Sequence, residues 1–133
     1  MVQHVVVGLT GATGQVFGIA ALELLAERSD VESHLVLSDA AARNINQEDD
    51  HSVGAVRELA DHVYDNGNIG ASIASGSFPA TGMLVAPCSM NSLSKIAHGA
   101  ADNLLLRAAD VTLKERRNLV LMPMEKPLSR IHL

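Results

Sequence analysis

Short apolar runs alternate with stretches of helical spacing along this chain, and that alternation constrains the fold more than any other feature. The runs are rich in Val and Leu, are bounded by turn-forming residues, and are typical of buried strands. We expect strands over 4–9, 31–37, 62–64, 83–86 and 119–122. We expect helices over 15–28, 40–46, 53–61, 91–97 and 103–117. Strands that alternate with helices predict an α/β fold, with a parallel sheet and right-handed crossovers.

Two of these elements carry finer expectations. Pro87 follows the run 83–86, and we expect it to end that strand, because proline cannot donate to a sheet ladder. The segment 15–28 has an apolar side and a charged side, which indicates an amphipathic helix. The apolar side comprises Phe17, Ala20, Ala21, Leu24 and Leu25.

Length and composition exclude several classes of protein. A chain of 133 residues suits a single domain spanning 1–133, and 47% hydrophobic with 19% charged residues is typical of a globular core. The net charge of −5 argues against broad nucleic-acid binding. No apolar run is long enough to cross a membrane, and we see no signal peptide. The single cysteine, Cys88, cannot form an internal disulfide, so we expect a cytoplasmic protein.

A glycine-rich loop, Gly8 to Gly14, lies between the first expected strand and the first expected helix. Glycines let the backbone approach a ligand closely, and the helix N-terminus favours a phosphate, so the loop predicts phosphate binding rather than only a tight turn. The loop does not identify the nucleotide, because its spacing also fits atypical NAD(P)-binding dehydrogenases. Those enzymes usually carry a Tyr-x-x-x-Lys pair, which Tyr64 does not form here.

Small polar residues follow two further strands. Ser38 could donate to a cofactor or cap a helix, and its position favours neither interpretation. The segment Pro87–Ser94 gathers hydroxyl and amide groups at a strand-to-helix turn, which suits a phosphate or a flavin edge as well as a capped helix. A lone cysteine is more often a small buried hydrophobe than a nucleophile, and we interpret Cys88 in that way.

The last expected helix carries a charged face. Arg107, Asp110, Lys114 and Arg117 share that face at 3.6 residues per turn. Arg107 and Lys114 could clamp an anionic ligand, or the face could simply be solvated, with an Asp110–Lys114 pair.

The remaining ionisable residues give weaker signals. Glu48 belongs to an acidic turn but could reach a site, and Glu125 follows the last strand, where an acid or base would be useful. The six histidines lack metal-ligand spacing, so we predict no metal site. They are His4, His34, His51, His62, His98 and His132.

Taken together, four separated motifs resemble those of the UbiX-type flavin prenyltransferases, within the flavoprotein superfamily. The motifs are Gly8–Gly14, Ser75–Phe78, Pro87–Ser94 and Arg107–Arg117. The resemblance implies a Rossmann-like, doubly wound parallel sheet with helices on both faces. It implies FMN as the bound flavin, dimethylallyl phosphate as co-substrate, and transfer of the dimethylallyl group to the flavin. It also implies a homo-oligomer, commonly a dodecamer with sites at subunit interfaces, and a UbiD-type decarboxylase that receives the product.

The resemblance assigns roles to individual residues of this chain. It implies catalytic roles for Thr13, Glu48, Lys114 and Glu125. It implies cofactor contacts at Gly11, Ala12, Thr13, Ser38, Ser89, Met90, Asn91, Ser92, Arg107 and Met124. An allylic phosphate leaves readily when cations hold its charge and a nearby acid protonates it.

The chain departs from the family at two places. The family usually has an arginine where this chain has Met124, and a thioether cannot hold phosphate bidentately. The family also continues past Leu133, with a tyrosine and a basic residue that bind the prenyl phosphate. The leading hypothesis is a flavin prenyltransferase. The alternatives are an FMN-binding accessory or carrier protein of a decarboxylase system, and an NAD(P)-binding reductase.

Overall fold

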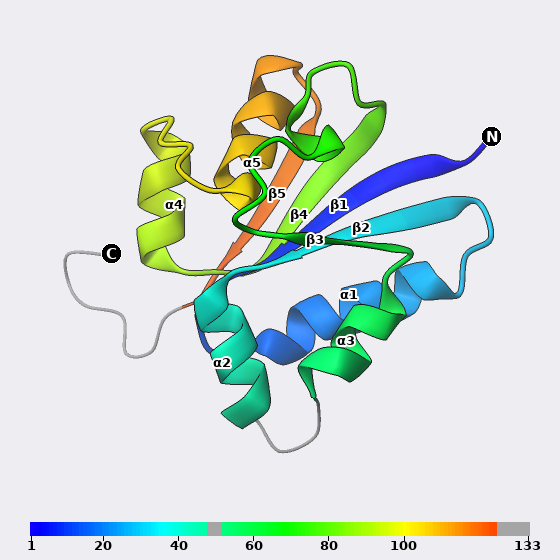
Figure 1. The fold of residues 1–133 in the computed structure, drawn as a ribbon, viewed down its shortest axis with the longest axis vertical. Helices are drawn as coiled ribbons and strands as arrows, with labels where there is room; N and C mark the ends of the chain where they lie inside the picture. Colours follow the sequence, from blue (N-terminus) through cyan, green and yellow to red (C-terminus); the bar gives the residue numbers. More distant parts are fainter. Residues whose placement is uncertain (48–51, 125–133) are drawn as a thin grey trace.

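The computed structural model describes residues 1–47 and 52–124, and its centre is a five-stranded parallel sheet. The strand order is β3-β2-β1-β4-β5, and all neighbouring strands run parallel. The strands are β1 (Gln3–Leu9), β2 (Val31–Leu37), β3 (His62–Asp65), β4 (Ala80–Cys88) and β5 (Asn118–Pro123). Figure 1 shows their carboxyl ends converging at one edge, while the N-terminus lies at the other end of the sheet.

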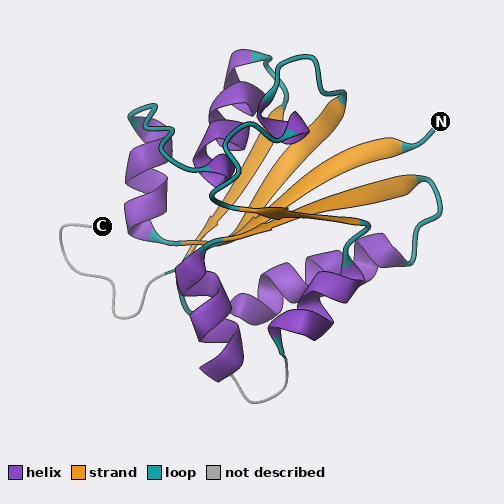
Figure 2. Ribbon diagram, in the orientation of Figure 1, coloured by secondary structure: helices purple, strands orange, loops and turns teal. Residues whose placement is uncertain are grey.

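Helices cover both faces of this sheet, so the molecule has three layers (Figure 2). The first three helices pack on one face, and the last two pack on the other together with a short 3₁₀ turn, η1. The helices are α1 (Gln15–Ala26), α2 (Asp39–Gln47), α3 (Val53–Leu59), α4 (Met90–Ala97) and α5 (Leu104–Lys114), and η1 is Ser72–Ala74. The predicted α/β class and its Rossmann-like doubly wound arrangement are confirmed.

The strand order reverses beside β1. From β1 the chain builds β2 and β3 outward on one side, and it then crosses back to place β4 and β5 on the other side. In open parallel sheets the crevice outside the carboxyl ends of the strands, at such a reversal, is where ligands bind. Here that crevice lies between the loop after β1 and the loop after β4.

The core has two parts, one on each face of the sheet. On one face Ile19 and Leu22 of α1 pack against Val7, Leu9 and neighbours of β1 and β2. On the other face, helix α5 buries Leu104, Leu105 and Leu106, among other residues, against the strands. Burying one such side chain contributes on the order of 1.5–3 kcal/mol.

Helix α1 does not bury the side that its sequence indicates. Phe17 and Leu24 were predicted on the apolar side, yet they are 47% and 66% exposed. Gly18 and Ile19 are buried instead. The helix is apolar around most of its circumference, so the spacing of its apolar residues does not select a face. The missing side chain of Gly18 selects it, because only a glycine allows the helix this close to the carbonyl oxygen of Ala86.

Strand β4 is longer than the sequence predicted. It begins at Ala80 rather than 83 and continues through Pro87 to Cys88, so the expectation that Pro87 ends the strand was wrong. The pairing with β5 shifts register between Val85 and Cys88, where proline has no N–H to give. The carbonyl of Pro87 still accepts a hydrogen bond from the Thr10 backbone. Within the two described ranges, no helix has the length and apolar character needed to cross a membrane.

Candidate functional site

Three loops meet at the carboxyl edge of the sheet, after β2, β1 and β4. Backbone hydrogen bonds hold them in register: the N–H of Ser38 donates to Leu9, and the N–H of Thr10 donates to Pro87. The predicted segments Gly11–Thr13, Ser38 and Ser89–Ser92 therefore lie side by side, although they are far apart in the sequence. The structure brings most of the predicted flavin contacts to one place.

A threonine that sequence reasoning did not single out joins two of these loops. Thr10 is 2% exposed, and its hydroxyl donates to the Pro87 carbonyl at 2.9 Å. The same oxygen accepts the backbone N–H of Ser89 at 2.7 Å. One buried side chain thus fixes the glycine-rich loop against the start of α4.

A second residue that sequence reasoning missed shapes the glycine-rich loop from inside. Gln15 is fully buried, and its Nε2 donates to the carbonyls of Thr10 at 2.6 Å and Ala12 at 2.9 Å. Asn44 of α2 donates to the Ala12 carbonyl at 3.2 Å. The available signal was a polar side chain at the first position of a largely apolar helix.

The N-terminus of α1 offers backbone donors to a ligand. Gly14 precedes the helix in a left-handed conformation, with φ of 91°, and no side-chain hydrogen bond from the described residues caps the helix. By contrast, the other four α-helices in the described ranges are each capped by a side-chain oxygen that accepts a backbone N–H. The capping residues are Ser38, Ser52, Ser89 and Asn103. The first N–H groups of an uncapped helix are unpaired and carry positive potential. With the exposed hydroxyl of Thr13 beside them, they suit the phosphate of FMN.

The loop after β4 presents a second helix N-terminus. The Ser89 hydroxyl accepts the N–H of Ser92 at 3.1 Å and donates to the Ser92 hydroxyl at 3.0 Å. Asn91 is exposed and Met90 is half-buried. Cys88 is buried, and its burial raises the pKa of the thiol to about 11. It is therefore a neutral thiol at neutral pH, in agreement with its interpretation as a buried hydrophobe.

Ser38 caps α2, since its hydroxyl accepts the N–H of Ala41 at 3.0 Å. A cavity of about 280 Å³ opens beside it, between the carboxyl ends of β2 and β3. Arg57, Tyr64 and Asp65 contribute to its walls. The capping interpretation therefore holds for Ser38, and the cavity leaves room for a ligand next to the same residue.

The two basic residues of α5, Arg107 and Lys114, lie toward opposite ends of the strands. Near the start of the helix, Leu105 packs over Gly8, close to the carboxyl edge of the sheet. Further along, the Thr112 hydroxyl lies 4.0 Å from the sulfur of Met83, near the start of β4. Arg107 therefore lies toward the three loops, whereas Lys114 lies toward the opposite edge. Both are exposed, and Lys114 pairs with Asp110 at 2.9 Å.

Met124 lies at the carboxyl edge with the glycine-rich loop. Its N–H donates to the Cys88 carbonyl at 3.0 Å. A Cβ added at Gly14 would lie 3.1 Å from its methyl group. Met124 therefore stands next to the N-terminus of α1. Glu48 and Glu125 lie outside the described residues.

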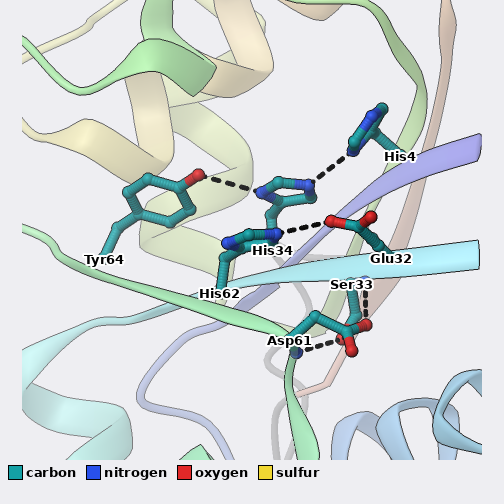
Figure 3. A network of polar contacts seen from close by, with 7 residues as sticks. All are labelled: His4, Glu32, Ser33, His34, Asp61, His62 and Tyr64. Carbon is teal, nitrogen blue, oxygen red and sulfur yellow. Dashed lines mark hydrogen bonds and ion pairs between the residues drawn. The ribbon is translucent and has the colours of Figure 1, made fainter.

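The histidines are not as scattered as their spacing indicates. The rings of His4, His34 and His62 come together on one face of the sheet (Figure 3). Burial, with smaller contributions from His62 and His4, lowers the pKa of His34 to about 4. His34 is therefore neutral at neutral pH.

The fold and this edge of the sheet define a class: a doubly wound α/β protein whose glycine-rich loop and uncapped helix N-terminus lie outside the carboxyl ends of the strands. A family model described as "Flavoprotein" matches residues 2–132, and the chain belongs to that family.

Its relatives and solved neighbours are similar over nearly the whole chain. It is 54% identical to flavin prenyltransferase UbiX of Neisseria meningitidis over 133 residues, covering 100% of the chain and 70% of that relative. A dodecameric FMN-dependent UbiX-like decarboxylase from Escherichia coli O157:H7 has a TM-score of 0.94 at 49% identity, covering 98% of this chain and 70% of the other. AnUbiX, solved with FMN and dimethylallyl pyrophosphate, has a TM-score of 0.93 at 48% identity, covering 99% and 70%.

Proposed function

We propose that this chain is a flavin prenyltransferase, which joins a dimethylallyl group from dimethylallyl phosphate to reduced FMN and makes prenylated FMN. The observation that carries the proposal is the convergence of the Gly11–Thr13 loop, Ser38 and the Ser89–Ser92 turn on one crevice, in a chain about half identical to enzymes of that name. Residues 1–133 would form a single flavin-binding domain. The protein would act in the cytoplasm. A UbiD-type decarboxylase would receive the prenylated FMN.

The N-termini of α1 and α4 would contact different parts of FMN. The uncapped start of α1, with Gly11, Ala12 and Thr13, would hold the phosphate through backbone N–H groups and a hydroxyl. Ser38 and the turn Ser89–Ser92 would contact the remainder of the flavin. Thr10 and Gln15 would not contact FMN themselves. They hold the contacting loops in place through buried hydrogen bonds.

In the transfer, the allylic C–O bond of the co-substrate would break as a bond to the flavin N5 forms, with loss of the N5 proton and departure of inorganic phosphate. Closing the ring at C6 would then add a proton to the double bond of the dimethylallyl group and remove the proton from C6. Arg107 and Lys114 would stabilise the charge of the departing phosphate. Glu48 and Glu125 would supply or accept the protons that the step needs. Met124 stands where a further cation would help, so this chain would bind the phosphate less tightly than a relative with arginine there. We propose that this step uses no metal ion.

The opposed placement of Lys114 supports a site shared between subunits. Within one chain, Lys114 lies toward the amino edge of the sheet and Thr13 lies at the carboxyl edge. We propose a homo-oligomer, a dodecamer like the Escherichia coli neighbour, in which Lys114 of one subunit serves the flavin of another. The exposed apolar side chains of α1, among them Phe17 and Leu24, support such an assembly.

Incubating the protein with reduced FMN and dimethylallyl phosphate should yield a flavin heavier by one dimethylallyl group, detected by mass spectrometry. Omitting the prenyl phosphate is the control. Bound FMN that stays unmodified would favour the accessory or carrier protein. Preferential binding of NAD(P) over FMN in competition would favour the reductase.

Co-expressed chains should report whether Lys114 acts across subunits. With FMN held well below the dissociation constant of the Thr10→Val chain, Lys114→Ala and Thr10→Val chains should each be nearly inactive alone. Co-expressed, the two chains should recover up to about a quarter of the wild-type rate. If each site takes Thr10 from one subunit and Lys114 from another, random mixing leaves both residues intact in about a quarter of the sites. Prenylated flavin formed per oligomer is the measurement. No recovery in mixed oligomers would mean that Lys114 serves the site of its own chain.

A further inference from the structure

Four polar side chains line up on one face of the sheet because of strand register. In the parallel ladder, His4 of β1 stands opposite Glu32 of β2, and His34 of β2 stands opposite His62 of β3. Side chains two residues apart on a strand point to the same face, so Glu32 and His34 share it. Their sequence separations are large, and only the pairing of the strands unites them.

The potential ligand atoms are close enough for one ion. One ligand atom each from His4, Glu32 and His34 lies within 4.8 Å of the other two. Nδ1 of His4 and Nε2 of His34 are 2.9 Å apart. Two nitrogens bound to one tetrahedral zinc ion are about 3.3 Å apart, so a small rotation of either ring would suffice.

The surrounding contacts orient these atoms as the outer partners of a metal site do. Nδ1 of His34 lies 2.9 Å from the Tyr64 hydroxyl. With its proton on Nδ1, His34 donates to Tyr64 and directs the lone pair of Nε2 toward His4. Nε2 of His62 lies 2.6 Å from a carboxylate oxygen of Glu32 and holds that group in place (Figure 3). Such outer hydrogen bonds typically fix the tautomer and orientation of ligating groups.

We propose that His4, Glu32 and His34 bind a divalent transition-metal cation of the zinc class, at a site separate from the flavin loops. Two imidazoles and one carboxylate are ligands that zinc accepts, with a fourth position left to water. Imidazole also suits copper and nickel, and the carboxylate brings the negative charge that partly neutralises the ion.

The location makes this a structural site rather than part of the transfer reaction. His34 lies four residues before Ser38, about 13 Å along an extended strand. The ring of Phe78 packs edge-on against His4 and His34, with ring centroids 5.4 Å and 5.0 Å away. An ion here would clamp β1 to β2 and, through His62, would reach β3.

Titration of untagged, chelator-treated protein with Zn²⁺ tests the site. The wild type should bind one Zn²⁺ per chain by calorimetry, and its Tm should rise with the zinc concentration, because a ligand of the folded state stabilises it. Substitution by Co²⁺ should give the d–d absorption of a four- or five-coordinate ion. A wild type that shows neither a stoichiometric heat nor this spectrum overturns the proposal, whatever the variants do.

Variants locate the ion. Glu32→Gln and His4→Gln change partly buried groups without changing their hydrogen-bonding capacity greatly, and each should weaken Zn²⁺ binding by more than about 10-fold. His62→Gln, which removes only an outer partner, should weaken it by about 10-fold. His98→Gln, at an exposed histidine on the end of α4, is the matched control and should bind as the wild type does. Equal affinity in Glu32→Gln and the wild type, or an equal loss in His98→Gln, would place the ion elsewhere.

Discussion

Replacing Gly18 with alanine is expected to lower the free energy of unfolding by about 3 kcal/mol, the upper range for adding a methyl to a packed site. A Cβ at this position would lie 2.1 Å from the carbonyl oxygen of Ala86 and 2.7 Å from Cγ of Leu9. The first contact is with backbone, so α1 must move away from β1 and β4. Urea unfolding followed by circular dichroism measures the loss.

The control for this variant is Gly54→Ala in α3. A Cβ at Gly54 would have no neighbour within 4 Å, so the substitution only removes backbone freedom from the unfolded chain. It should raise stability by about 0.5–1 kcal/mol. If the two variants had equal stabilities, the close approach of α1 to β4 would not be what requires glycine at position 18.

Replacing Thr10 with valine is expected to weaken FMN binding by about 10–100-fold while the chain remains folded. Valine keeps the shape of the side chain but leaves the Ser89 N–H without its partner, and the Pro87 carbonyl keeps only the Thr10 N–H of its two donors. An unpaired buried polar group costs about 1–3 kcal/mol of stability. The loops could move apart to expose that group to water, but this movement would distort the crevice between them. Quenching of flavin fluorescence on titration with the protein gives the dissociation constant.

Thr10→Ser separates the hydroxyl from the methyl group. Serine can make both hydrogen bonds, so its FMN affinity should stay within about 3-fold of the wild type, although the lost methyl costs some stability. If Thr10→Val bound FMN as tightly as Thr10→Ser, then the two loops would be held together by other contacts, and Thr10 would not be a positioning residue.

Much of the fold could be predicted because each element carries its own local signal. The run 31–37 was predicted with the bounds that β2 has, and the helix 91–97 differs from α4 by one residue. The ends of β4 could not be predicted in this way. Pro87 forbids one ladder hydrogen bond, but whether a strand continues past it depends on a register shift in the neighbouring strand.

The candidate site also has features that the sequence predicted and features that only the structure showed. Glycine-rich and hydroxyl-rich turns after strands indicate a phosphate-bearing ligand from composition and position alone, and the four motifs narrowed it to a flavin. Thr10 and Gln15 gave no comparable signal, because their roles are hydrogen bonds to loops whose positions the sequence does not show. Helix geometry alone places Arg107 and Lys114 two turns apart, about 10 Å along the axis. It does not show that this distance runs from the carboxyl edge of the sheet toward the amino edge.

By itself, then, the sequence determined the α/β class and the order of the elements, and it predicted phosphate binding at the first loop, since all three follow from local periodicity and turn chemistry. Only the tertiary structure decided which face of α1 is buried, where β4 ends and which histidines meet. These depend on close approach and on strand register. His4, His34 and His62 lie on three strands, and only the register of parallel pairing brings their rings onto one face.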